Sequence, residues 1–140
     1  NYEIIAHIRP TTPDRDVKDV DKAIKFFEKS NFSSLRSVHE MPETAYKSLE
    51  LNSKNFLKPL KNIKQNLDQL NRPRQYFKKT YTPNGVIDIY RKNFILKNKK
   101  LFGKKVLGFK TKFAHEIDTL DQFKFINYNF GRKYERAHKR

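Results

Sequence analysis

The sequence predicts an α/β layer fold with a mainly parallel sheet and a small hairpin inserted between about residues 42 and 75. Two observations support this class. Short apolar and β-branched runs alternate along the chain with segments whose apolar residues recur at helical spacing. The 140 residues also include twelve Phe and seven Tyr, which supply enough bulky apolar area for the packed core of one domain, or most of one.

The first three elements are predicted from simple patterns. Residues 4–8 form an apolar run that predicts a strand, and Pro10 and Pro13 end it because proline interrupts strand pairing. Residues 17–29 predict a helix, since apolar residues recur every three or four positions and aspartates stand near its start. The alternation over residues 34–39 predicts a second strand.

The middle of the chain predicts an excursion from the main sheet. Residues 46–51 alternate between apolar and polar side chains, and after the turn-like run 52–55, residues 56–60 are predicted to pair back as a hairpin. Residues 61–70 carry only a weak helical signal, which ends at the motif Arg72-Pro73-Arg74-Gln75.

Three short elements are predicted next. Residues 86–90 have the β-branched content of a strand, residues 93–97 predict a short helix, and residues 105–109 predict another strand.

The last predicted element is a helix over residues 120–129. Thr119 and Gln122 have the spacing of a capping box at its start, and Gly131 is expected to end it. The domain is therefore predicted to span residues 1–131, followed by a basic tail over residues 132–140.

The charge of the chain raises one alternative function. It has 31 Lys and Arg against 15 Asp and Glu, a formal charge of +16, and such a charge attracts nucleic acid. The lysines are scattered among many Asn, Ile, Phe and Tyr residues, however, which is typical of a solvated surface. A basic nucleic-acid-binding module is therefore the alternative hypothesis, and we do not favour it.

The composition also excludes several kinds of site. With no cysteine, the sequence has neither a disulfide framework nor a thiolate zinc site, and a reducing compartment fits best. No run approaches the roughly 18 apolar residues of a membrane span, and the first ten residues lack a signal-peptide pattern. We expect a cytoplasmic protein without a membrane partner.

Glu116 and Asp118 form the sharpest chemical pattern in the sequence. Residues two apart in an extended segment point to the same face, so this pair is predicted to present two carboxylates together. Mg²⁺ prefers such hard oxygen ligands and completes its coordination with water and substrate phosphate. The alternative is that Glu116 is a surface residue and Asp118 helps to cap the following helix.

Other candidate ligand-binding residues are basic or allow a close approach. Asn84 and Gly85 are predicted to form a tight turn, which either lets a ligand approach the backbone or simply connects a hairpin. His115 has no second histidine nearby, so we do not favour a transition-metal site there. Four cations fall in predicted loops or at strand ends, where they are suited to phosphate or a sugar carboxylate: Arg9, Lys47, Arg72 and Arg74.

Several motifs, in this order, resemble those of the acylneuraminate cytidylyltransferases, the CMP-sialic acid synthetases. The similarity covers nearly the whole chain, to about Phe130. It implies part of a Rossmann-like nucleotidyltransferase three-layer sandwich, with the region of about residues 42–75 serving dimerisation. The motifs are Arg9-Pro10-Thr11-Thr12-Pro13-Asp14-Arg15, His39-Glu40-Met41-Pro42 with Lys47, Arg72-Pro73-Arg74-Gln75, Tyr81-Thr82-Pro83-Asn84-Gly85-Val86-Ile87 and Glu116-Ile117-Asp118-Thr119.

The resemblance implies an enzyme that transfers CMP from CTP to the anomeric hydroxyl of a nine-carbon 2-keto sugar acid and releases pyrophosphate. It implies that Glu116 and Asp118 hold Mg²⁺ and that Arg74 and Lys47 contact substrate or phosphate, these four being the catalytic group. CTP, a nonulosonic acid and a second copy of the chain are the implied partners. The implied substrate-binding residues are Arg9, Thr11, Gln75, Tyr81, Asn84 and Gly85.

Two features of the sequence depart from the family pattern. The family usually has Gln, Asp and Tyr where this chain has Arg9, Glu116 and Asp88. The family's N-terminal glycine-rich basic loop, which cradles the CTP phosphates, has no counterpart here. We therefore expect the chain to be the C-terminal portion of such an enzyme, inactive by itself. A noncatalytic sugar-nucleotide-binding domain is a third hypothesis.

Overall fold

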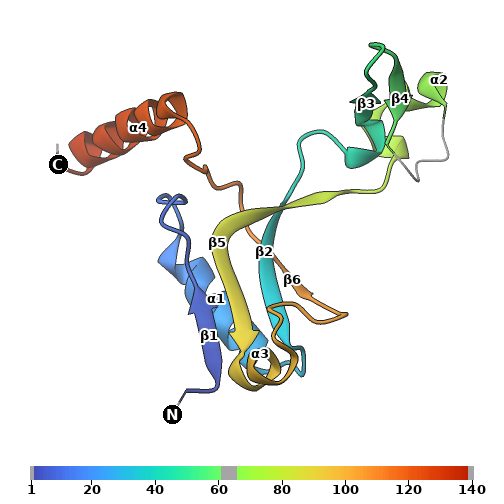
Figure 1. The fold of residues 1–140 in the computed structure, drawn as a ribbon. Coiled ribbons are helices and arrows are strands. Elements are labelled where there is room, and N and C mark those ends of the chain that lie inside the picture. Colours follow the sequence, from blue (N-terminus) through green and yellow to red (C-terminus); the bar gives the residue numbers. More distant parts are fainter. Residues whose placement is uncertain (1, 61–65, 139–140) are drawn as a thin grey trace. The chain divides into compact units, whose positions relative to one another are not determined.

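The computed structural model describes residues 2–60 and 66–138 (Figure 1). The chain forms two compact units, one of Asn1–His39 with Pro83–Arg140 and one of Glu40–Thr82, and each is described by itself. Within the described ranges, no helix is long and apolar enough to cross a membrane.

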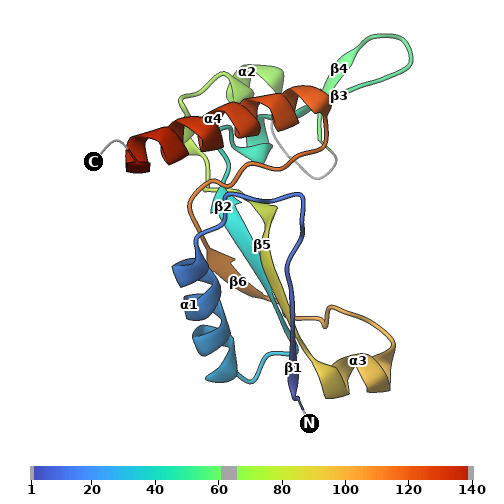
Figure 2. The same cartoon turned by 90° about the vertical axis from the view of Figure 1, so that its left-hand side faces the viewer.

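The first unit is built on a four-stranded sheet (Figure 2). β1 pairs antiparallel with β5, with Ile4 opposite Arg91, whereas β2 pairs parallel with β6, with Leu35 opposite Leu107. The strand order is β1-β5-β2-β6, from β1 (Ile4–His7), β2 (Ser34–Glu40), β5 (Tyr81–Arg91) and β6 (Leu107–Lys110).

The sheet is mixed, so the prediction of a mainly parallel sheet was wrong. The Arg91 backbone N–H donates to the Ser33 carbonyl at 2.9 Å, which puts the end of β5 beside the start of β2. The two strands therefore run in opposite directions. The reason is the connection between them: a chain that leaves β2 and returns to its neighbour without a crossover helix comes back antiparallel.

Helix α1 (Val17–Glu28) confirms the predicted helix to within one residue. Asp16 caps it by accepting a hydrogen bond from the Lys18 backbone N–H at 2.9 Å. The helix covers one face of the sheet (Figure 2) and buries Ala23 and Phe27 there. The core cluster consists of Ala23, Phe27, Leu35, Val86, Ile87, Ile89 and Ala114.

The short helix predicted after β5 is confirmed as α3 (Lys92–Asn98), and the final helix, α4, is longer than predicted (Leu120–His138). The capping box is confirmed, because the Gln122 N–H donates to Thr119 Oγ1 at 3.2 Å and the Thr119 N–H donates to Gln122 Oε1 at 2.9 Å.

The predicted helix stop was wrong, because α4 continues through Gly131 to His138. One glycine inside a helix costs only about 1 kcal/mol relative to alanine, which is too little to end it by itself. Residues 139–140 lie outside the described residues.

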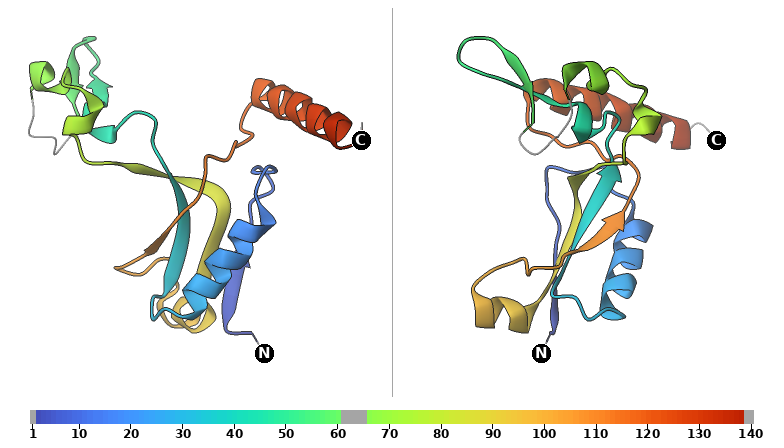
Figure 3. Two further views of the ribbon diagram at one scale, coloured as in Figure 1. Left: turned by 180° about the vertical axis from the view of Figure 1, so that it is seen from behind. Right: turned by 90° about the vertical axis from the view of Figure 1, so that its right-hand side faces the viewer.

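The second unit contains the predicted hairpin, β3 (Leu49–Leu51) and β4 (Leu57–Pro59), which pair antiparallel (Figure 3). Asn52 shapes the connection, since its Oδ1 accepts from the Lys54 and Phe56 N–H groups, each at 2.9 Å. The weak helical signal over residues 61–70 corresponds to α2 (Leu67–Leu70), and residues 61–65 lie outside the described ranges. Two single-turn helices, η1 (Ala45–Lys47) and η2 (Arg74–Tyr76), complete the unit.

Candidate functional site

The loop after β1 is fastened to the segment that leads into α4. The Ile117 N–H donates to the Thr11 carbonyl at 2.8 Å. Asp14 holds His115 twice: its Oδ1 accepts from the His115 backbone N–H at 3.1 Å, and its Oδ2 lies 2.8 Å from His115 Nδ1. These contacts bring Thr11 beside the segment that carries Glu116 and Asp118.

Gly85 is the point where three segments meet. A Cβ atom on Gly85 would lie 2.0 Å from Thr12 Oγ1 and 3.1 Å from Glu116 Oε1. Only glycine therefore allows the side chains of Thr12 and Glu116 to lie this close to β5. We call Thr12, Gly85 and Glu116 the strand-junction site.

Asn84 and Gly85 do not form the predicted turn. Both lie inside β5, and neither has a positive φ. The β5 strand begins before the β-branched run that marks it in the sequence, so the prediction placed its start too late. Gly85 is required here by close packing and not by a left-handed backbone.

Thr12 is fully buried, and among the described residues its Oγ1 finds no hydrogen-bond partner. Buried hydroxyl groups are almost always paired, because an unpaired one loses its bonds to water without replacement. The unpaired Oγ1 lies at the strand-junction site. It is an unsatisfied buried polar group on the Glu116 side of β5.

Two carboxylates and one hydroxyl in this part of the chain are oxygen ligands of the kind that Mg²⁺ prefers. Glu116 is half-buried and Asp118 is exposed, so both carboxylates are reached by solvent, and the Thr12 hydroxyl adds a third hard oxygen nearby. In residues 2–60 and 66–138, no group of three or more His, Cys, Asp or Glu side chains is placed to hold a metal ion.

Thr119 caps α4 through its hydroxyl. The backbone N–H of Asp118 donates to Gln122 Oε1 at 2.7 Å. Asp118 was assigned to capping α4 in the alternative hypothesis, and it contributes its backbone N–H at the start of this helix.

The Asn84 side chain is committed to a buried network that sequence reasoning missed. Its Nδ2 donates to Thr111 Oγ1 at 2.8 Å and lies 3.2 Å from His39 Nδ1. The Thr111 hydroxyl gives its single hydrogen to the Lys112 carbonyl, so it accepts from Asn84, and His39 Nδ1 accepts as well. Asn84 thereby ties β5 to β2 and to the segment after β6.

Arg9 lies at a second cluster, around Asp88. Arg36 binds the Asp88 carboxylate with two hydrogen bonds of 3.0 and 3.1 Å, and Arg9 Nη2 lies 3.7 Å from Asp88 Oδ2. The hydrogen bond with Asp88 raises the pKa of Arg36, and burial raises the pKa of Tyr90. An aspartate inside the apolar run of β5 is the sequence signal that could have revealed this cluster, because buried carboxylates are normally paired.

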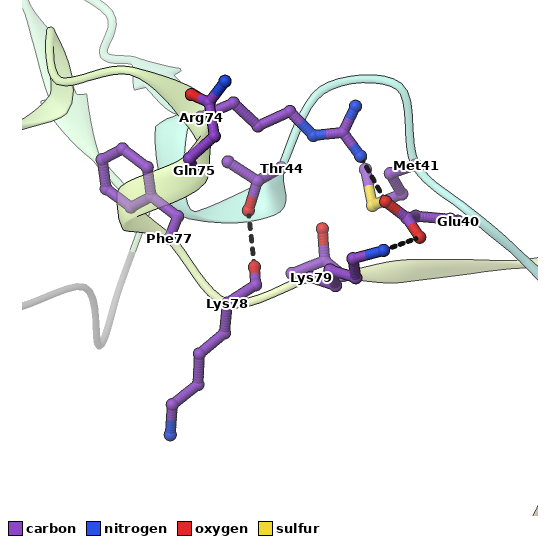
Figure 4. Close-up of a pocket in the computed structure, with 9 residues that line it drawn as sticks. Glu40, Met41, Thr44, Arg74, Gln75, Phe77, Lys78 and Lys79 are labelled. Atoms are coloured by element: carbon purple, nitrogen blue, oxygen red, sulfur yellow. Dashed lines mark hydrogen bonds and ion pairs between the residues drawn. The ribbon is translucent and has the colours of Figure 1, made fainter.

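The second unit contains a pocket of about 460 Å³ (Figure 4). Arg74 Nη2 lies 2.5 Å from Glu40 Oε1, and Lys79 Nζ lies 2.9 Å from Glu40 Oε2. The lining residues are Glu40, Met41, Thr44, Arg74, Gln75, Phe77, Lys78, Lys79 and Thr80.

The predicted residues therefore fall into separate groups. One group lies around Thr12 and contains Thr11, Gly85 and Glu116. Arg9 lies instead beside Asp88. In the other unit, Arg74 and Gln75 both line the pocket. Lys47 does not line it and donates to the Arg72 carbonyl at 3.3 Å. Tyr81 is half-buried in β5 and is not among the residues that line the pocket.

No family model matches the sequence, and no curated protein matches it. The structure is similar to that of 4-diphosphocytidyl-2C-methyl-D-erythritol synthase from Anaerococcus prevotii DSM 20548, with a TM-score of 0.59 and 12% sequence identity. The match covers 92% of this chain and 59% of that one, so the chain spans less than two thirds of the enzyme's length. The similarity shows the fold, an α/β arrangement of a mixed four-stranded sheet and a β-hairpin.

Proposed function

We propose that the chain is the metal-binding and sugar-binding portion of a CMP-nonulosonate synthetase. The reaction transfers CMP from CTP to the anomeric hydroxyl of a nine-carbon 2-keto sugar acid. One observation carries the proposal: Glu116 meets Gly85 and an unpaired, buried Thr12 hydroxyl at one point. The name of the similar enzyme describes a diphosphocytidyl compound, which agrees with cytidylyl chemistry.

In this proposal the sugar hydroxyl oxygen attacks the α-phosphorus of CTP, the bond to pyrophosphate breaks, and the hydroxyl proton is released. Such a transfer needs positioning and charge neutralisation more than covalent catalysis. Glu116 and Asp118 hold Mg²⁺, which would neutralise charge on the phosphates. Arg74 and Lys47 contact substrate or phosphate, while Gln75 and Tyr81 contribute to sugar binding.

A homodimer belongs to the same proposal. The β3–β4 hairpin exposes Leu51, Phe56 and Leu57, each more than half accessible, and an exposed apolar patch of this kind is typical of a protein–protein contact. A cytoplasmic location is also proposed, from the absence of cysteine and of a described membrane-spanning helix.

Pyrophosphate release tests the proposed activity. The protein to be assayed is the one translated from the whole gene, supplied with CTP, Mg²⁺ and a sugar acid. We expect it to release pyrophosphate with N-acetylneuraminate or with a legionaminate or pseudaminate relative. Asp118→Asn and Glu116→Gln are each expected to lower kcat by about 10²- to 10³-fold, because each removes charge from the metal site.

Asp121→Asn is the matched control, since Asp121 is an exposed carboxylate in the first turn of α4 and should leave kcat unchanged. The proposal is wrong if none of these sugars supports pyrophosphate release, and its metal site is wrong if Asp118→Asn releases pyrophosphate at the unaltered rate. Nanomolar binding of DNA or RNA with a steep salt dependence would instead favour the nucleic-acid-binding alternative.

A further inference from the structure

Glu40 occupies the charged end of the pocket in the second unit (Figure 4). Each of its carboxylate oxygens is bound by a different cation: Oε1 by Arg74 at 2.5 Å and Oε2 by Lys79 at 2.9 Å. The two cations are therefore spaced to hold one carboxylate between them.

Both ion pairs of this internal carboxylate are partly exposed. The side chains of Glu40, Arg74 and Lys79 are 34%, 44% and 68% exposed. Exposed ion pairs add little stability, because water and salt screen the charges and ordering the side chains costs entropy. The hydrogen bond to Glu40 also raises the pKa of Lys79, so Lys79 is cationic at neutral pH. These two ion pairs therefore add little to holding Glu40 in its position.

The remaining lining suits a polyhydroxylated acid. Arg74, Lys78 and Lys79 against Glu40 give the lining a formal charge of 3 − 1 = +2, which attracts anions. Gln75 adds an amide, and Met41 and Phe77 add apolar surface for the C–H groups of a sugar ring. A volume of about 460 Å³ is within the usual range for small-molecule sites.

We propose that Glu40 is a tethered competitor, seated in the carboxylate subsite of this pocket, that a sugar acid displaces from between Arg74 and Lys79. The identity of the ligand as a sugar acid rests on the proposed function. Glu40 makes the pocket selective against small free carboxylates. Because Glu40 is part of the chain, its carboxylate is present at a high effective concentration, which a free carboxylate such as acetate does not reach. A sugar acid adds contacts through its ring and hydroxyls, and so replaces Glu40 where acetate does not.

The test is a titration of the ¹⁵N-labelled chain with sodium acetate, with N-acetylneuraminate and with the methyl ester of N-acetylneuraminate. Glu40→Gln is expected to tighten binding of the acid by about three- to tenfold, because two exposed ion pairs no longer compete. The ester should bind no tighter to this variant than to the unaltered chain. Acetate should shift the Arg74 and Lys79 signals only in Glu40→Gln.

Two matched controls are available in the same unit. Glu43→Gln changes an exposed glutamate outside the pocket lining and should leave every affinity unchanged. Lys78 and Lys79 are neighbours, but only Lys79 is ion-paired with Glu40, and Figure 4 shows the Lys78 side chain directed away from Glu40. Lys79→Met should weaken binding of the acid to Glu40→Gln, and Lys78→Met should weaken it less.

The inference is overturned if Glu40→Gln binds neither acetate nor the acid more tightly than the unaltered chain, or if acid and ester bind this variant equally. If acetate binds the variant at Arg74 and Lys79 while N-acetylneuraminate binds neither form, the carboxylate subsite is supported and the sugar-acid function is not.

Discussion

Replacing Gly85 with alanine is expected to lower the free energy of unfolding by about 2 kcal/mol, within the range for overpacking a filled core. The new Cβ would lie 2.0 Å from Thr12 Oγ1 and 3.1 Å from Thr12 Cβ. Thr12 is fully buried and β-branched, so rotation about its χ1 angle gives little relief. The loop after β1 would have to move, and Glu116 would move with it.

Gly108→Ala is the matched control, because Gly108 is also a strand glycine and a Cβ there meets nothing within 4 Å. Its free energy of unfolding should be unchanged or higher by up to about 1 kcal/mol, since alanine lowers the entropy of the unfolded chain. Urea denaturation of both variants measures the difference. Equal midpoints would mean that Thr12 does not pack against Gly85.

Arg36→Met is expected to cost about 3 kcal/mol of stability. Asp88 is only 3% exposed, and Arg36 donates two hydrogen bonds to its carboxylate. Removing one partner of a buried ion pair typically costs about 3 to 5 kcal/mol. The 30% exposure of Arg36 and the presence of Arg9 at 3.7 Å from Asp88 place the expected value at the low end.

Arg9→Met provides the comparison within the same cluster. Arg9 is 42% exposed and 3.7 Å from Asp88, so its loss should cost less than about 1 kcal/mol. Asp88→Leu combined with Arg36→Met should recover much of the lost stability, because apolar groups tolerate burial where a lone charge does not. Thermal unfolding of the three variants distinguishes these cases, and equal losses for Arg36→Met and Arg9→Met would contradict the pairing.

Features set by residues close in sequence could be predicted. The apolar spacing and the acidic start placed α1 to within one residue, and the pair Thr119 and Gln122 fixed the start of α4. Both helix starts depend on contacts between residues within about one helical turn of each other, so the spacing of residues in the sequence is enough to predict them. The β3–β4 hairpin was predictable for a similar reason.

Features set by residues far apart in sequence could not be predicted. Asp14 and His115 are 101 positions apart, and neither residue has a local pattern that indicates its partner. The orientation of β5 and the burial of Thr12 likewise depend on where the returning chain enters the sheet. Gly131 failed as a helix stop because the residues after it continue the helix.

The proposed function depends on Glu116 and Asp118 jointly holding a divalent ion, and Mn²⁺ tests this most directly. Mn²⁺ takes the same oxygen ligands as Mg²⁺, and its unpaired electrons broaden nearby NMR signals. On the ¹⁵N-labelled chain, substoichiometric Mn²⁺ should remove the amide signals of Thr12, Gly85 and Ile117. Excess Mg²⁺ should restore them, and Asp118→Asn should prevent the effect. If those three signals persist while signals around Asp16 and Asp19 of α1 disappear, the ion is held elsewhere and the proposed function is contradicted.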